Sequence, residues 1–428
     1  MNHPENIKAM NWFLDPIGTA LSKAINTRMC PQLTDSDFIK YGIMKVLLEG
    51  KSGRDFVQKM RMTYLATNLS VSLFFKSLAS VRREKLTNEV AEELRQIVDA
   101  KILGTPGADP LEQHPELKGY AVYATDGHSH SASAHEPFRF GKRYPVTHIY
   151  SINLRTHTSA HNVLLQPEEN RKKEHEIKAL KRMVIKAMRM NEPTGTKVIQ
   201  VYDPAVTDYP QWHRWKQGSS IYVITMEKSN AVWISKSNQP FNGEDERNNG
   251  VLSDEKVCSS SGFTMRRIKY RDPVTCKIYS FLTNVMTLPP GLIAFLYFLR
   301  WNIEKMFDEF KNSLDEKKAW TGQESGKIQQ AQFMSMTHNL MLLAEHELKY
   351  EHNIVDEKVQ KKRRKALLLM QEKAQQAGRA FNCLVAGCQR ATKRSLQFIR
   401  WLRYCLAPST LLDKALDLLP ILMLEYLA

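Results

Sequence analysis

The stretch that decides the fold is residues 120–127, Tyr120-Ala121-Val122-Tyr123-Ala124-Thr125-Asp126-Gly127, a short apolar run that ends in a turn dipeptide. An apolar run of this length, bounded by Asp-Gly, predicts a buried β-strand. Similar runs occupy residues 146–154, 162–165 and 197–202, and the strongly charged segment 168–190 predicts a helix. Strands followed by a helix and another strand predict an α/β core.

Helical patterns precede this core. Residues 1–115 carry apolar residues at helical spacing, and Thr87 is placed to cap a helix over 88–98. Residues 104–110 contain two glycines and two prolines, a combination that breaks helices. We therefore expect a helical N-terminal region that ends close to residue 115.

The predicted secondary structure changes twice in the second half of the chain. Residues from 212 to about 276 are polar-rich and β-like, which predicts a β-rich insertion into the core. Residues 277–285 predict another strand, and Pro289-Pro290 opens a helix that we expect to run to about residue 314. The expected organisation is a helical N-terminal region over 1–115, a first part of the core over 116–212, an insertion over 213–276, a second part of the core over 277–345, and a helical C-terminal region over 346–428.

Charge and composition narrow the class of protein. The 61 Lys and Arg residues exceed the 45 Asp and Glu residues, for a formal charge of +16 in 428 residues. Such a surplus favours a polyanionic partner, most often nucleic acid, although a merely basic soluble protein remains the alternative. The six scattered cysteines argue against a zinc ribbon or disulfide scaffold. With no signal peptide and no apolar run near the ~20 residues that span a bilayer, we expect a soluble intracellular protein and no membrane partner.

Two aspartates follow predicted core strands. Asp126 ends the run 120–125, and Asp203 ends the run 198–202. Asp-Gly and Asp-Pro are also turn dipeptides, so each aspartate alone has an ordinary structural explanation. Carboxylates at two strand ends and on one later helix can nevertheless converge. Metal-assisted phosphoryl transfer needs such an oxygen cluster, because it seats two Mg²⁺ ions about 4 Å apart.

The third carboxylate lies on the helix after Pro290. At 100° per residue, Tyr297, Arg300, Glu304 and Lys311 fall within a sector of about 60°, beside an apolar face. Ordinary ion pairs on a solvated face are the alternative. Asp308 is rotated only about 40° from Glu304 on the same wheel. We favour Glu304, because Asp308 has lysines at i−3 and i+3 with which it can pair.

These residues carry a resemblance to a known family. Tyr297, Arg300, Glu304 and Lys311 match the Tyr-(2)-Arg-(3)-Glu-(6)-Lys signature of cut-and-paste insertion-sequence transposases with a DDE active site. Asp126 and Asp203 occupy the strand-end positions of the first two acids in that family, and a β insertion before the third acid is typical of it. The resemblance covers about residues 118–345.

The resemblance implies a fold, an activity and a site. The core would be ribonuclease-H-like, and Asp126, Asp203 and Glu304 would be catalytic ligands of two Mg²⁺ ions, with Mn²⁺ as a substitute. Arg300, Lys311 and Tyr297 would bind DNA phosphates near the scissile bond, and the helical region 1–115 would be the DNA-binding region that recognises the element ends. The protein would cut double-stranded DNA at the element ends and join it to target DNA, as a homodimer in the bacterial cytoplasm and nucleoid.

Several alternatives remain open from the sequence. The family often has Arg after its second Asp, where this chain has Pro204, and this leaves Asp208 as a weaker candidate for that acid. The whole chain could instead be a catalytically inactive DNA-binding descendant of such an enzyme, or a Mg²⁺-dependent nuclease of the same fold.

Three further features have weaker interpretations. A group of histidines predicts a polar loop beside DNA, with a zinc site as the minor alternative; it comprises His128, His130, His135, His148, His157 and His161. Trp233 and Tyr279 could stack on a flipped base, although a core position in the sheet is the stronger expectation. The cationic run 361–365 could contact DNA phosphates or be a solvated helix face.

Overall fold

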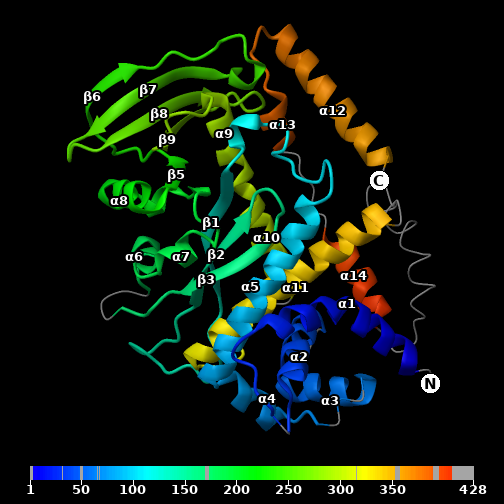
Figure 1. The fold of residues 1–428 in the computed structure, drawn as a ribbon. Coiled ribbons are helices and arrows are strands. Elements are labelled where there is room, and N and C mark those ends of the chain that lie inside the picture. The colour runs from blue at the N-terminus through cyan, green and yellow to red at the C-terminus, as the bar shows by residue number, and fades with distance from the viewer. Residues whose placement is uncertain are drawn as a thin grey trace.

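The computed structural model describes residues 3–30, 32–48, 52–64, 66, 68–168, 173–314, 316–351, 357–388 and 395–406. Its strands form one mixed sheet in the order β3-β2-β1-β4-β5-β9-β8-β7-β6 (Figure 1). The strands are β1 (Tyr120–His130), β2 (Val146–Asn153), β3 (Ser159–Leu164), β4 (Lys197–Val201), β5 (Ile221–Met226), β6 (Trp233–Asn238), β7 (Val251–Ser259), β8 (Thr264–Arg271) and β9 (Ile278–Thr283). The sheet and its helices confirm the expected α/β class.

Strand directions divide the sheet into two parts. β1, β2 and β3 form an antiparallel meander, and β4 and β5 lie parallel to β1. β9 pairs antiparallel with β5, and β8, β7 and β6 continue antiparallel from it. The β-rich insertion therefore extends the core sheet through β9, because its strands share one continuous hydrogen-bonded ladder with the core.

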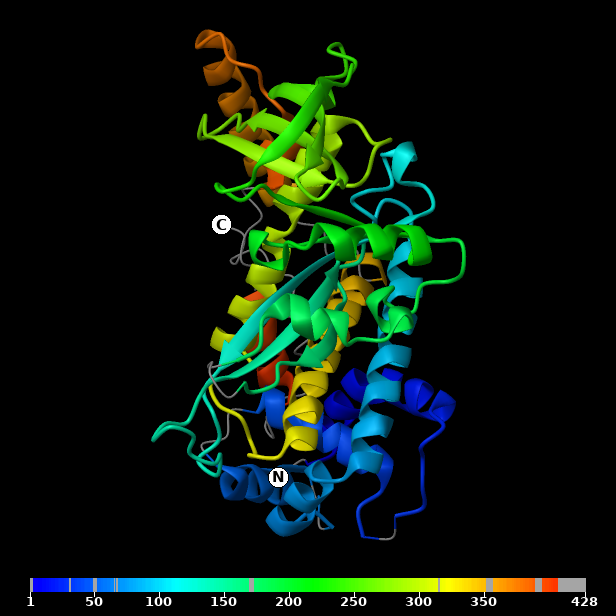
Figure 2. The ribbon, with the colours of Figure 1, turned by 90° about the vertical axis from the view of Figure 1, so that its left-hand side faces the viewer.

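Helices cover both faces of the sheet, with the views in Figures 1 and 2 taken 90° apart. One face packs against α6 (Glu176–Lys181), α7 (Ile185–Met188) and α8 (Tyr209–Ser219) through an apolar cluster that includes Trp212 and Tyr202. The other face packs against α9 (Pro290–Leu299), α10 (Trp301–Asn312) and α11 (Glu324–Glu351). Short 3₁₀ turns η1 (Pro115–Leu117), η2 (Pro204–Val206) and η3 (Glu246–Asn248) complete the core.

The N-terminal helices share the main hydrophobic core. They are α1 (His3–Lys23), α2 (Asp35–Leu47), α3 (Gly53–Tyr64), α4 (Val71–Leu78) and α5 (Val81–Leu103). α11 packs against α1, α2, α4 and α5, and the same core cluster reaches the sheet. The C-terminal helices are α12 (Glu357–Gln376), α13 (Cys383–Cys388) and α14 (Ser395–Cys405). None of the helices in the described ranges is long and apolar enough to cross a membrane.

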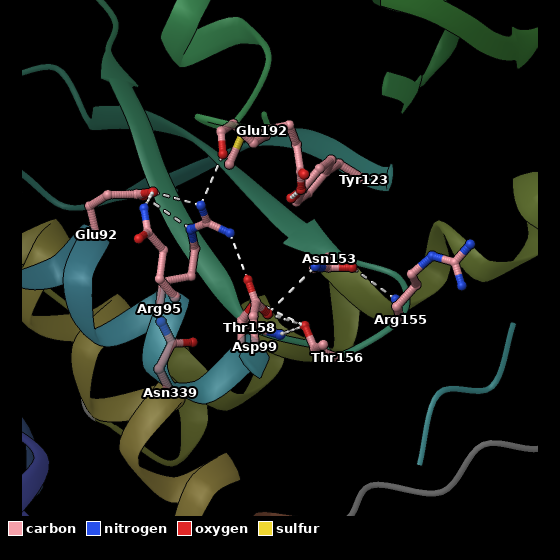
Figure 3. A network of polar contacts seen from close by, with 12 residues as sticks. Glu92, Arg95, Asp99, Tyr123, Asn153, Arg155, Thr156, Thr158, Glu192 and Asn339 are labelled. Carbon is pink, nitrogen blue, oxygen red and sulfur yellow. Dashed lines mark hydrogen bonds and ion pairs between the residues drawn. The ribbon is translucent and has the colours of Figure 1, made fainter. Parts of the chain in front are cut away.

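A buried polar network joins α5 to the sheet (Figure 3). Arg95 is 4% exposed and forms ion pairs of 2.7 Å with both Glu92 and Asp99. Asp99 in turn accepts hydrogen bonds from Thr156 and Thr158 in the turn between β2 and β3. Burial raises the pKa of Asp99, whereas the charge of Arg95 lowers it. Each of these buried polar groups has its hydrogen-bond or ion-pair partners within the network. The network therefore fixes the position of α5 against the core.

The structure corrects several expected boundaries before the long helix. The segment 168–190 does not form one helix: α6 and α7 are short and separated by a turn. Residues 212–219 are not β-like, because they belong to α8, whose Trp212 and Trp215 are buried against the sheet. Thr87 does not cap a helix. Ser80 caps α5, and the Thr87 hydroxyl donates to Arg83 O at 2.6 Å inside that helix.

The long helix after Pro290 is interrupted at Arg300. α9 ends at Leu299 and α10 begins at Trp301. Across the junction Arg300 N donates to Tyr297 O at 3.1 Å, and Ile303 N donates to Arg300 O at 3.0 Å. Both are i→i+3 bonds of the tighter 3₁₀ type, which interrupt the α-helical pattern locally. Arg300 therefore occupies the junction of two helices and does not lie within one.

Candidate active site

Two parallel strands bring Asp126 and Asp203 together. β1 and β4 pair in register from Tyr120–Lys197 to Ala124–Val201, so two residues further along each chain Asp126 lies beside Asp203. Side chains alternate between the faces of a strand, and Ala124 and Val201 face the main core, where α9 and α10 pack. Asp126 and Asp203 therefore emerge on the same face as the helix that carries Glu304.

Asp126 lies within β1 and not at its end, which corrects the sequence expectation. β1 continues to His130 because β2 pairs with this segment, from Asp126–Tyr150 to His130–Val146. The Asp126 carboxylate accepts the Gly127 N–H at 2.8 Å and is only partly exposed. The Asp-Gly dipeptide thus occurs inside a paired strand, where ladder pairing overrides its turn preference.

Asp203 begins a 3₁₀ turn. Its Oδ1 accepts the Ala205 N–H at 2.7 Å as the N-cap of η2, and Pro204 occupies the first position of that turn. Proline suits this position because it has no N–H that needs a partner. Pro204 therefore has a local structural role in the turn that follows Asp203.

Asp208 has a structural role of its own. It caps α8 by accepting the Gln211 N–H at 2.9 Å, and it forms an ion pair with Lys181 of α6. Both contacts stabilise the packing of α8 beside α6. Asp203, which follows β4 directly and adjoins Asp126, is the better candidate for the second acid.

Arg300 bridges the first and third acids. Its Nη1 donates to Asp126 Oδ2 at 2.9 Å, and its Nη2 donates to Glu304 Oε1 at 2.9 Å. The residue is 7% exposed, and its Nε has no hydrogen-bond partner among the described residues. Glu304 lies four residues after Arg300, so the expected common face of these two residues is confirmed. The guanidinium holds carboxylates from β1 and α10 together.

The electrostatics of Asp126 reflect this cluster. Burial raises the pKa of Asp126 to about 6, despite the lowering effects of Arg300 and of the Gly127 hydrogen bond. The negative charges of Asp203 and Glu304 raise it further. One guanidinium therefore compensates the buried negative charge only in part, and additional positive charge at this position would stabilise the ionised cluster.

Glu176 is a fourth carboxylate that the sequence interpretation missed. It begins α6 on the opposite face of the sheet, and burial together with the charges of Asp126 and Asp203 raises its pKa, while Lys173 lowers it. Gly127 permits this approach, since a Cβ at that position would lie 2.5 Å from Glu176 Oε1. In the sequence, Glu176 could not be distinguished from the other acids of a charged segment, because only the fold brings α6 close to β1.

The remaining predicted site residues occupy different environments. Tyr297 is 5% exposed, and its ring lies 4.9 Å from that of Phe281 and 5.8 Å from the Arg300 guanidinium. Burial raises the pKa of Tyr297, and Arg300 lowers it. Lys311 is exposed near the end of α10. Asp308 is also exposed on α10, whereas Lys305, one of its expected partners, donates to Asn302 Oδ1 at 3.2 Å.

Four of the six histidines do not lie in the expected polar loop: His128 and His130 lie in β1, His148 in β2 and His161 in β3. His135 lies in the exposed loop after β1, and His157 lies in the turn between β2 and β3. His128 stacks on Phe307 of α10 at 4.6 Å, and the His148 and His161 rings lie within hydrogen-bond distance, at 3.0 Å. His128 also pairs at 2.9 Å with Glu316, which is 2% exposed.

The four histidines of the strands are part of the core because β1–β3 pair beneath α10. His148 is completely buried, and burial holds its pKa well below the usual histidine range, with the neighbouring histidines adding to the effect. A buried imidazole with a depressed pKa is neutral at physiological pH. His130, His148 and His161, whose pKa values burial lowers, therefore contribute packing and hydrogen bonds to the core without adding positive charge.

The two candidate stacking aromatics lie on opposite faces of the sheet. Trp233 packs near Tyr209 of α8, with ring centroids 5.6 Å apart, and donates to Glu227. Tyr279 stacks on Phe281 at 6.0 Å and contacts Phe298 of α9. The two rings belong to different apolar clusters. They therefore cannot contact one base together.

The donor set suits a divalent cation in its chemistry, since carboxylate oxygens are the ligands that Mg²⁺ prefers. In the described ranges, however, no group of three or more His, Cys, Asp or Glu side chains is arranged to hold a metal ion. The Arg300 guanidinium lies between Asp126 and Glu304 instead. Arg300 would have to move before both carboxylates could bind one ion.

Comparison with known proteins adds no family assignment to this geometry. A scan of the sequence against protein-family models gives no match, and a search of curated proteins gives none either.

Proposed function

We propose that the chain is a DDE-type transposase that cuts double-stranded DNA at the ends of a mobile element and joins those ends to target DNA. The observation that carries the proposal is the approach of Asp126, Asp203 and Glu304 to one another. They come from β1, from the turn after β4 and from α10, and the charges of Asp203 and Glu304 both act on Asp126. Asp126 and Arg300, which are 174 positions apart in the chain, are joined here by a hydrogen bond.

The sheet supports a ribonuclease-H-like core for this enzyme. Three antiparallel strands followed by two strands parallel to the first, in the order β3-β2-β1-β4-β5, are the arrangement expected of such a core. Helices lie on both faces, and the insertion β6–β8 enters before the helix with the third acid. The acids lie near the middle of this sheet, on β1 and after β4.

Asp126, Asp203 and Glu304 would hold Mg²⁺, which when bound would activate the attacking oxygen and stabilise the charge of the phosphodiester. The chain itself supplies the remaining steps. Asp126 and Asp203 would lie on the face of the sheet against which the scissile phosphate binds. Once Arg300 leaves its two carboxylates, its planar guanidinium could donate two hydrogen bonds to a non-bridging pair of phosphate oxygens. Exposed Lys311 would bind a phosphate further along the same strand.

A cleavage and joining assay tests the proposal. The substrate is duplex DNA that carries the inverted repeats flanking the gene, with supercoiled plasmid as target and Mg²⁺ present. We expect nicks that expose 3′-hydroxyl groups, followed by joined products. Asp203→Ala should abolish both reactions and leave DNA binding intact. The matched control Asp208→Ala removes a nearby acid that caps α8 and should retain cleavage. Equal activity of the two variants would overturn the assignment.

A non-catalytic DNA-binding protein is the second candidate. The absence, within the described ranges, of three side chains arranged for a metal ion favours it. Such a protein would bind end DNA equally well with Mg²⁺ or with a chelator and would produce no nicks. A product pattern of nicks without joined strands would instead identify a nuclease.

A further inference from the structure

The helix α12 carries a cationic face that the candidate active site does not use. Residues 361–365 are all basic and all exposed. At 100° per residue, Lys361, Arg364 and Lys365 fall within a sector of about 100°. Leu367 and Met370, which are half-buried, and Ala374, which is 5% exposed, lie on the opposite side. The helix therefore packs through a small apolar side and directs three cations away from the protein.

The far end of α12 is anchored to the insertion. In the connection to α13, Asn382 Nδ2 donates to Arg247 O at 2.7 Å, and the Phe381 carbonyl accepts from Asn249 Nδ2 at 3.1 Å. Arg379 contacts Cys276 in the turn between β8 and β9. α13 then packs against α9. These contacts fix the direction of α12, which runs along the outside of the molecule in Figure 1.

α12 is connected to the helices of the candidate site through α13. α12 packs against α13, and α13 packs against α9, which is followed by α10 after the junction at Arg300. The cations Lys361, Arg364 and Lys365 lie on the side of α12 opposite its packed residues.

We propose that Lys361, Arg364 and Lys365 form a binding surface for the phosphate backbone of double-stranded DNA. The proposal rests on the proposed function for the identity of the polyanion. None of the three side chains has an ion-pair partner in the part of the chain that the structure describes. Their spacing along the helix, about 6 Å in all at 1.5 Å per residue, is short enough for neighbouring phosphates of one strand.

DNA suits this surface better than an anionic membrane does. A helix that lies on a membrane needs its apolar residues on the face opposite its cations. Here Leu368, which is 52% exposed, lies on the same face as Lys361 and Lys365. Leu369 is equally exposed but is rotated by about 100° from Leu368. It lies between Lys362 and Lys365 on the helical wheel. Because the inward apolar residues are already used in packing, no continuous apolar face remains to enter a lipid layer.

Binding of a labelled duplex of about thirty base pairs and arbitrary sequence tests the surface, with affinity measured over a range of salt concentrations. The variant replaces Lys361, Arg364 and Lys365 together with Gln. Each lost phosphate contact lowers the log–log salt slope by about 0.9, so the triple variant should lose between 2 and 3 in slope. Lys373→Gln is the matched control, because this exposed lysine lies on the same helix but outside the cationic sector.

The outcomes separate the inference from the function on which it rests. A wild-type slope that persists in the triple variant refutes the role of α12 and leaves the transposase proposal standing. Failure of the wild-type protein to bind duplex DNA refutes both. If the triple variant loses slope but the wild-type protein shows no Mg²⁺-dependent nicking, the DNA-binding role of α12 is supported and the catalytic proposal is refuted. Unchanged DNA binding with weaker binding to phosphatidylserine vesicles would reassign the surface to membranes.

Discussion

Replacing Asp126 with Asn should make the free protein more stable while it abolishes cleavage. The change keeps the shape of the side chain and removes its charge. In the folded protein the pKa of Asp126 is raised to about 6 from an ordinary value of 3.8. The side chain is 20% exposed, so solvent screens this effect only in part. About two pKa units at 1.36 kcal/mol each correspond to a cost of about 3 kcal/mol for the ionised group.

The direction of the pH dependence follows from the raised pKa. Below pH 3.8 the carboxyl is protonated in both states and has no effect on folding. As pH rises towards 6, the Asp126 carboxyl ionises first in the unfolded chain. The free-energy cost of ionising it in the folded protein therefore increases until the carboxyl is ionised in both states. Asp126→Asn should therefore gain up to about 3 kcal/mol at neutral pH and about half of that near pH 5.

Urea denaturation with and without Mg²⁺ measures both effects. Asp208→Asn is the control, because Asn can also cap α8 and only an ion pair with Lys181 is lost; we expect a change of a few tenths of a kcal/mol, about the value of a surface pair. Mg²⁺ should stabilise the wild-type protein and have less effect on Asp126→Asn. A variant no more stable than wild type at neutral pH, or equally stabilised at both pH values, would refute the reasoning.

Three further predictions follow from the site and its surroundings. Arg300→Gln removes the guanidinium that competes for Asp126 and Glu304, so without DNA it should bind Mn²⁺ more tightly in calorimetry yet cut DNA more slowly, by about 10²-fold or more; weaker Mn²⁺ binding would contradict the bridging role. Glu304→Gln should abolish Mg²⁺-dependent cleavage while Asp308→Asn retains most of it, and the reverse result would show that the register on α10 is wrong. As pH drops from 7 to 5, the wild-type protein should lose more stability than His148→Gln, because unfolding frees His148 to bind a proton near its ordinary pKa of 6.5. Urea denaturation should show a difference of about 2 kcal/mol between the two pH profiles at pH 5, and parallel profiles would contradict the depressed pKa of His148.

The spacing of residues along the sequence was sufficient to predict several features of this protein. The pair Arg300 and Glu304 could be placed on one face from their separation of four residues, because a helix repeats every 3.6 residues. The strand around Tyr123 and the strand before Asp203 could be recognised from short apolar runs, since burial on both faces requires them. The mixed α/β class followed from the order of such runs along the chain.

Other features depended on contacts that no local pattern encodes. The junction at Arg300 and its bond to Asp126 arise where α9, α10 and β1 meet. Glu176 reaches the same region only because α6 packs across the sheet at Gly127.

The histidines illustrate the difference most clearly. As a sequence they resemble a polar loop, yet pairing of β2 with β1 and with β3 carries His128 and His148 into the core beneath α10. The amino-acid sequence by itself determined which side chains share a helix face or follow a strand, because those relations extend over a few residues. Only the tertiary structure decided which of them are buried, paired or brought together, because these relations depend on strand order and on helix packing across the whole chain.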